Sequence, residues 1–462
     1  MRILDFLCSS IVFWMSWIII PLLVEILPAI GGFFILVKKK IVQKPVEPIT
    51  NYPEICIIIP VYNSADTLKS CIASIYHSTY PRHLMRIYLI HNEGQDNSFE
   101  IFQECQREFP ELMMQWLNSK QGKAKALNLA LYNSEGKYII HIDSDGRLQE
   151  DALKNMVNRF EADSEIGCMT GVILTDKDLI RQEKSYWKRL LQRLEFCEYA
   201  QAFLSGRNFD SELNSIFTVS GAFSAFRKST ILKSQLYHTG TVSEDTQVTF
   251  QVRFLLKQRI YLCENAIFLS EPISGINQLY TQRQRWQRGE IEVSRLFFNK
   301  RLPTANLLAR SLMFRTLLYD HTFAFPRMIW YFALGCLVFK NYSMRLIIFS
   351  MGLIFGLYII SAYLYYFSII RYLADFPEIK KYYRKCGLLI ALLPFFNFMI
   401  FWIRLAGIIN SIDSQGSWRT RNLTEEGRAA VQETENMIAR PLQWLATLRG
   451  FVNVENEKNF EE

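Results

Sequence analysis

The sequence predicts an α/β domain with a mostly parallel central sheet, held between stretches of chain that are apolar enough to enter a membrane. Two observations carry this prediction. Short β-branched runs alternate with helical runs between residues 50 and 300, and long apolar segments lie on both sides. With 462 residues, the chain is long enough for two or more structural units.

Strands and helices are expected to alternate through the first half of this domain. The apolar runs predict strands at 55–59, 86–90, 112–117 and 137–142, and the runs between them predict helices at 65–76, 97–109 and 123–131. Strands that alternate with helices form parallel sheets with helices on both faces. Ligands of such sheets bind beyond the carboxyl ends of the strands.

Charge and cysteine usage narrow the function classes. The formal net charge is +8, and no recognised nucleic-acid module accompanies it, so nucleic acid is not an expected partner. The nine cysteines are scattered without a Cys-x-x-Cys pair, which predicts neither a zinc site nor a disulfide framework. Free thiols in a reducing cytosol are the simplest interpretation.

The apolar segments predict a multi-pass cell-membrane protein. Residues 1–37 are expected to form an N-terminal transmembrane helix, too long for a cleaved signal peptide, and lysines at 38–40 then place the domain 38–300 in the cytoplasm. Residues 301–320 are amphipathic and predict an interfacial helix. The region 321–410 predicts about three spans, at 323–339, 346–370 and 387–410, before a polar tail, 411–462, whose side stays open.

Asp143 and Asp145 directly follow the fourth predicted strand, in His-Ile-Asp-Ser-Asp-Gly. Two residues apart in extended chain, they project to the same side. Two carboxylates next to a diphosphate suit Mg²⁺ or Mn²⁺. The alternative is a solvated turn, since Asp and Gly are turn formers.

Asp245, in Ser-Glu-Asp, stands where a helix extending to about residue 257 is expected to begin. Ser243 with acids in the first turn is typical of a helix cap, so Asp245 and Glu244 have a structural interpretation. The two roles are compatible, and a suitably placed Asp245 is a candidate general base.

Three residues share a helix face farther along the chain. Gln282, Arg285 and Trp286 lie at i, i+3 and i+4. Arg285 is suited to phosphate oxygens and Trp286 to stacking on a sugar, while an interfacial helix with Arg and Trp at the headgroups is the competing interpretation. Lys123 stands at the start of a predicted helix. It would either bind a phosphate there or be exposed to solvent as an ordinary basic residue.

In this order, the motifs resemble those of membrane-integrated family 2 glycosyltransferases, the branch with synthases of poly-N-acetylglucosamine, hyaluronan and cellulose. Its exosortase-associated Gram-positive members look most similar. The resemblance runs from about residue 55 into the membrane spans and implies a GT-A-like domain. By motif, it implies the following roles: donor binding by Pro60, Tyr62, Asn92, Lys123, Asp143, Asp145 and Arg285; acceptor binding by Ser220, Gly221, Glu244, Gln282 and Trp286; metal binding by Asp143 and Asp145; and catalysis by Asp245.

One position departs from the family pattern. Asn92 stands where the family usually has an acid that reads uridine, which puts the nucleotide in doubt. The expectation is an inverting transfer from a nucleotide sugar, with UDP favoured, to a growing polysaccharide, with export of the product. Two alternatives stay open: a single-sugar transferase acting on a lipid-linked or short glycan acceptor, and a non-catalytic membrane protein that binds sugar nucleotides. Partner subunits cannot be inferred.

Overall fold

The computed structural model describes residues 26–42, 46–241, 243–298, 335–340, 343–413 and 423–426, together with 22 and 428. The strands are β1 Ile55–Val61, β2 Met85–His91, β3 Met113–Asn118, β4 Tyr138–Ile142, β5 Gly146–Leu148, β6 Ile166–Thr175, β7 Phe223–Arg227 and β8 Arg259–Ser270. The longer helices and those near the site are α3 Leu27–Val42, α4 Ala65–Tyr76, α5 Ser98–Glu108, α6 Lys123–Asn133, α7 Ala152–Ala162, α8 Lys177–Gln182, α9 Tyr186–Tyr199, α10 Arg207–Glu212, α11 Lys228–Lys233, α12 Glu244–Phe250, α13 Ile276–Phe298, α17 Met344–Tyr372, α18 Pro377–Lys385 and α19 Leu393–Asp413.

The eight strands form one sheet in the order β3-β2-β1-β4-β7-β6-β8-β5. The first four pair in parallel, as their alternation with helices predicts. The sheet as a whole is mixed, because β7 runs antiparallel to both β4 and β6, and β5 antiparallel to β8. The parallel pairing predicted from the sequence is thus found among β1 to β4 and between β6 and β8, whereas β5 and β7 are antiparallel to their neighbours.

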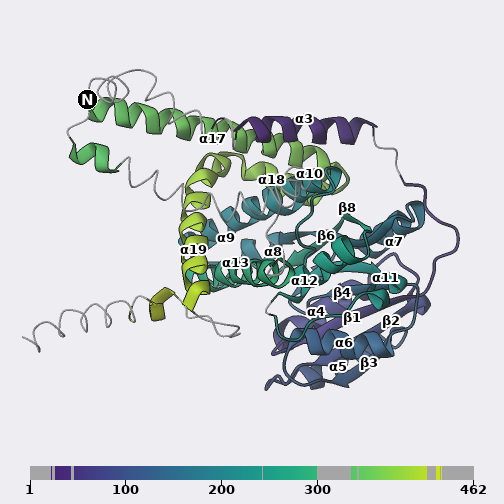
Figure 1. Cartoon of the computed structure of the whole chain (residues 1–462). Coiled ribbons are helices and arrows are strands. Elements are labelled where there is room, and N and C mark those ends of the chain that lie inside the picture. The colour runs from purple at the N-terminus through teal and green to yellow at the C-terminus, as the bar shows by residue number, and fades with distance from the viewer. Residues whose placement is uncertain are drawn as a thin grey trace, which may run out of the picture.

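Side chains of β1 alternate between the two faces of the sheet. Cys56 and Ile58 belong to the core shared with α6 and α9, whereas Ile57 and Ile59 belong to the core shared with α4, α5 and α7. This alternation follows from the two-residue period of a strand, and a β-branched run buried on both faces is typical of a central parallel strand. Figure 1 shows α4, α5 and α6 around this part of the sheet.

Among the described residues, two helices are long and apolar enough to cross a membrane, Ile347–Asp375 and Gly387–Asn410. They overlap the spans expected at 346–370 and 387–410. The interfacial helix expected at 301–320 lies outside the described residues, as do most of the span at 323–339, most of the tail 411–462 and most of the N-terminal segment 1–37. Transmembrane helices on both sides of the domain remain a prediction.

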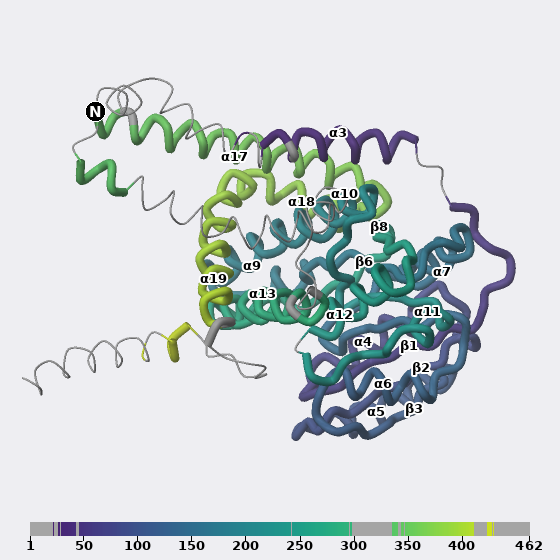
Figure 2. Tube along the Cα trace, viewed as in Figure 1, coloured from purple at the N-terminus to yellow at the C-terminus, as the bar shows by residue number. Residues whose placement is uncertain are grey.

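Helix α3 packs along α17, although the two are more than 300 residues apart in the chain (Figure 2). The hydroxyl of Tyr372 donates to the carbonyl of Leu36 at 2.9 Å. Lys39 at the end of α3 is buried and pairs with Glu212 of α10 at 2.9 Å. These contacts attach the apolar helices to the α/β domain, and α13 continues the attachment by packing on α19.

Candidate active site

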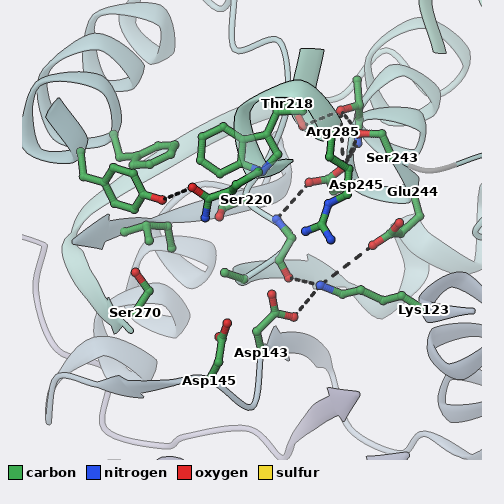
Figure 3. A pocket seen from close by; sticks show the side chains of 18 of the residues that line it. Lys123, Asp143, Asp145, Thr218, Ser220, Ser243, Glu244, Asp245, Ser270 and Arg285 are labelled. Carbon is green, nitrogen blue, oxygen red and sulfur yellow. Dashed lines mark hydrogen bonds and ion pairs between the residues drawn. The ribbon is translucent and has the colours of Figure 1, made fainter. Parts of the chain in front are cut away.

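A cavity of about 270 Å³ opens where β4 ends and α12 and α13 begin. Its lining includes these residues expected from the sequence: Lys123, Asp143, Asp145, Ser220, Gly221, Glu244, Asp245, Gln282, Arg285 and Trp286. In Figure 3, Asp143 and Asp145 lie on one side, and Asp245 and Arg285 face them from the other. Segments separated by more than 100 residues therefore meet at one site.

Backbone hydrogen bonds hold the acid pair in the loop between β4 and β5. The N–H of Asp143 donates to the carbonyl of Ala222 at 3.0 Å, and the carbonyl of Asp145 accepts from the N–H of Glu271 at 3.1 Å. Asp145 is exposed to the cavity, where desolvation by the surrounding protein, reinforced by the charge of Asp143, raises its pKa to about 6. This carboxyl therefore sits where a nearby cation would stabilise its charged form.

Lys123 joins three segments of the site. Its ammonium group donates to Asp143 Oδ1 at 2.5 Å and to the carbonyl of Gly221 at 3.3 Å, and it lies 4.0 Å from Glu244 Oε1. Burial by itself would lower the pKa of Lys123, but the carboxylates of Asp143 and Glu244 outweigh it and raise that pKa. The sequence suggested a phosphate ligand, whereas the structure pairs this cation with the acids of the site.

Asp245 is fixed by hydrogen bonds to both carboxylate oxygens. Oδ1 accepts from the N–H of Thr246 at 2.7 Å and from the hydroxyl of Ser243 at 3.0 Å, and Oδ2 accepts from the N–H of Gly221 at 3.2 Å. Ser243 thus bonds to the acid rather than capping the helix with its own side chain. Helix α12 is also shorter than expected, since a π-helical turn, Gln251–Leu255, replaces its continuation.

Glu244 is buried behind Asp245, only 7% exposed. Burial raises the pKa of Glu244 to about 7, with a further contribution from Asp245 that Lys123 opposes. Glu244 lines the cavity, and its Oε1 lies 4.0 Å from the Lys123 ammonium.

One face of α13 supplies an aromatic and polar wall. The hydroxyl of Tyr199 donates to Gln282 Oε1 at 3.4 Å. Trp286 is 37% exposed, and its ring centroid lies 6.3 Å from that of Tyr199 and 6.1 Å from that of Phe203. The helix spacing that groups Gln282, Arg285 and Trp286 does bring all three to the same cavity.

Three residues expected at the donor site do not line this cavity: Pro60 in β1, Tyr62 just after it, and Asn92 just after β2. Tyr62 is 51% exposed. Asn92 is buried, and its Oδ1 accepts from the N–H of Gly122 at 2.7 Å, so it holds the loop that leads into α6. Asn92 therefore contacts the residue directly before Lys123 and helps to hold the start of α6 in place.

Several residues that line the cavity could not be predicted from the sequence. Tyr199 and Phe203 come from α9 and the π-helical turn Ala200–Gly206, and Arg207 begins α10 directly afterwards. Burial lowers the pKa of Arg207 to about 10, which leaves it cationic at neutral pH. π-Helical turns often occur at functional sites, but no residue pattern distinguishes one from an α-helix.

The mixed sheet, with acids at a strand end, has a fold similar to that of a solved glycosyltransferase. Residues 56–233 match the family described as glycosyl transferase family 2. A solved structure with a similar fold is the mannosyltransferase PcManGT from Pyrobaculum calidifontis in complex with GDP-Man and Mn²⁺. Its TM-score is 0.54 at 16% identity, covering 78% of this chain and 96% of that one.

Two curated relatives are synthases of poly-beta-1,6-N-acetyl-D-glucosamine. The one from Staphylococcus epidermidis is 26% identical over 260 residues, 56% of this chain and 60% of the relative. The one from Staphylococcus aureus strain MSSA476 is 24% identical over 280 residues, 60% of this chain and 64% of the relative. The chain thus spans less than two thirds of the length of either relative.

Proposed function

We propose that this protein is an inverting, membrane-bound glycosyltransferase that moves a sugar from a nucleotide-sugar donor to a growing polysaccharide at the cytoplasmic face. The observation that carries the proposal is the convergence of Asp145, Asp245 and Arg285 on one cavity. The match to family 2 and the polysaccharide synthases among its relatives support this reading.

The donor end of the cavity is assigned to Asp143, Asp145 and Arg285. Asp143 and Asp145 line the same cavity two residues apart, so this pair of carboxylates fits Mg²⁺ or Mn²⁺. In the part of the chain that the structure describes, no three Asp, Glu, His or Cys side chains gather as a metal site, so diphosphate oxygens would complete the ligand set. A bound divalent ion supplies charge neutralisation for the leaving diphosphate. Arg285 would contact phosphate oxygens.

Asp245 is assigned as the general base. Its carboxylate accepts the proton of the acceptor hydroxyl while that oxygen bonds to the anomeric carbon and the bond from this carbon to the diphosphate breaks. Attack opposite the leaving group inverts the anomeric centre. The hydrogen bonds from Gly221 and Thr246 to Asp245 support the role, because a base acts only when it is held within reach of the proton.

Trp286, Tyr199 and Phe203 form the acceptor side in this proposal. Aromatic ring faces bury the apolar faces of sugar rings, and Gln282 adds a polar contact.

The donor is proposed to carry UDP. At position 92 the chain has Asn where the family pattern has an acid, and this Asn accepts a hydrogen bond from the N–H of Gly122. Single-sugar transfer to a lipid-linked or short glycan acceptor is the second candidate, and analysis of the products distinguishes it from polymer synthesis.

Transfer assays on the full chain in detergent or native membranes test the proposal. The chain is incubated with Mg²⁺ or Mn²⁺ and a panel that includes UDP-GlcNAc, UDP-glucose and GDP-mannose, and products are analysed by mass spectrometry. A ladder of products supports the polymer synthase, and a single added sugar supports the second candidate. Binding of a nucleotide sugar without any product or donor hydrolysis would instead identify a non-catalytic binding protein.

A further inference from the structure

Arg283 is a buried cation that the proposed reaction does not use. It follows Gln282 in α13, is 3% exposed, and pairs with Glu198 of α9, Nη2 to Oε2, at 2.5 Å. A buried charge is costly unless it is paired, so this ion pair ties α13 to α9 at a defined place.

The guanidinium group of Arg283 lies against two aromatic residues of the cavity wall. Its central carbon is 4.3 Å from the centroid of the Trp286 ring and 5.1 Å from that of Tyr199. Both rings line the cavity. Nε and Nη1 of Arg283 are buried, and no described acceptor meets hydrogen-bond geometry with them.

We propose that Arg283 is a positioning residue, which fixes the Trp286 and Tyr199 rings as the platform for the acceptor sugar. Glu198 holds the planar guanidinium group, and the guanidinium group in turn restricts the rings through cation–π contact. The assignment rests on the proposed function, because it takes the aromatic wall to be the acceptor side.

A lysine at this position would keep the charge but lose the planar face that matches the rings. A glutamine at position 198 would keep the shape of Glu198 but remove the charge that anchors Arg283. These two changes therefore distinguish a role of Arg283 in positioning the rings from a role in filling space between the helices. If Arg283 only stabilised the fold, its loss would lower thermal stability without a selective rise in the KM for the acceptor.

The experiment compares Arg283→Lys, Arg283→Met, Glu198→Gln and the double variant Arg283→Met/Glu198→Gln with the unchanged chain. Arg181→Met is the matched control, since Arg181 also pairs with a carboxylate, Asp178 at 3.0 Å, and lies 5.2 Å from an aromatic ring, that of Tyr382. Arg181 does not line the cavity. Fluorotryptophan labelling with fluorine NMR reports on the indole, and Trp286→Phe assigns its signal.

In the Arg283 and Glu198 variants, we expect the Trp286 signal to shift and the KM for the acceptor to rise by about threefold to thirtyfold, the range of a desolvated cation–π contact. The KM for the donor should change less, and the double variant should resemble Arg283→Met alone. Arg181→Met should leave the Trp286 signal in place.

An unmoved Trp286 signal in Arg283→Met would overturn the inference, as would equal changes in the KM values for donor and acceptor. The NMR measurement needs no turnover. Absence of transfer by the unchanged chain would therefore count against the proposed function, while the contact between Arg283 and Trp286 is judged separately.

Discussion

The ammonium group of Lys123 lies 2.5 Å from the carboxylate of Asp143, and this pair connects the start of α6 to the end of β4. Replacement of Lys123 by Met leaves Asp143 and Glu244 without their cation. Breaking a fully buried pair from one side costs about 3–5 kcal/mol, and this pair, whose side chains are 19% and 27% exposed, should cost less. We expect a lower melting temperature and at least a tenfold slower transfer, about the effect of 1.4 kcal/mol on a rate.

The matched control for that change is Lys137→Met. Lys137 pairs with Glu161 at 2.6 Å, but its side chain is 51% exposed. Exposed pairs contribute about 0–1 kcal/mol, so this variant should melt and turn over like the unchanged chain. Equal losses in both variants would show that Lys123 has no special place in the site.

Asp145→Asn tests the metal assignment. Loss of one carboxylate should raise the Mn²⁺ concentration that gives half-maximal transfer by about tenfold or more, since even changes to outer-shell partners weaken metal sites this much. A titration of transfer rate against Mn²⁺ and Mg²⁺ measures it. An unaltered metal titration would remove Asp145 from the proposed ligand set.

Gly221→Ala tests the contact between the backbone and the base. An added methyl group would lie 3.1 Å from Asp245 Oδ2 and 3.4 Å from Lys123 Nζ, so one of these side chains must move. A shift of a few tenths of an ångström relieves this contact. Because misplacement by about 1 Å can cost a hundredfold in rate, we expect a smaller loss in kcat, of about threefold to tenfold. Gly275→Ala is the control, because a methyl group there meets no described atom within 4 Å.

Glu195 predicts a pH dependence of stability. It is 1% exposed, its Oε2 accepts from the N–H of Ile273 at 3.1 Å, and burial raises its pKa to about 8 from an ordinary value of 4.5. Below pH 4.5, both the folded and the unfolded chain hold this proton. Between these pKa values only the folded chain keeps it, so the free energy of unfolding falls as pH rises.

Glu195→Gln should remove this part of the pH dependence. Melting temperatures measured from pH 5 to 8 should then fall less steeply with pH than those of the unchanged chain, because the amide cannot titrate. Parallel melting curves for the two proteins would show that Glu195 does not hold its proton in the folded state.

Local sequence patterns predicted the first half of the sheet well. The strands and helices from β1 to β4 lie within one or two residues of their expected positions, since each is a separate apolar run with clear ends. Strands β5 and β7 have only three and five residues, too short for a clear alternating pattern. The pairing of β6 with β8 includes register shifts, which local sequence does not specify.

The candidate site likewise has residues that could be predicted from the sequence and contacts that could not. Asp143, Asp145, Asp245 and the α13 face could be predicted as a group because their order along the chain resembles a known family. The pairing of Lys123 with Asp143, and the packing of Arg283 beneath Trp286, depend on contacts between distant segments. Such contacts are set by the fold and not by local sequence.

The most direct measurement of the central claim is the rate of sugar transfer by Asp245→Asn under saturating donor and Mn²⁺, next to Asp178→Asn, a change at an acid outside the cavity. Asparagine keeps the shape of Asp245 but cannot take the proton. The account predicts that transfer slows by about a hundredfold to ten-thousandfold, the usual contribution of a general base. Donor binding should persist, and Asp178→Asn should transfer normally. Transfer at the normal rate by Asp245→Asn would contradict the account.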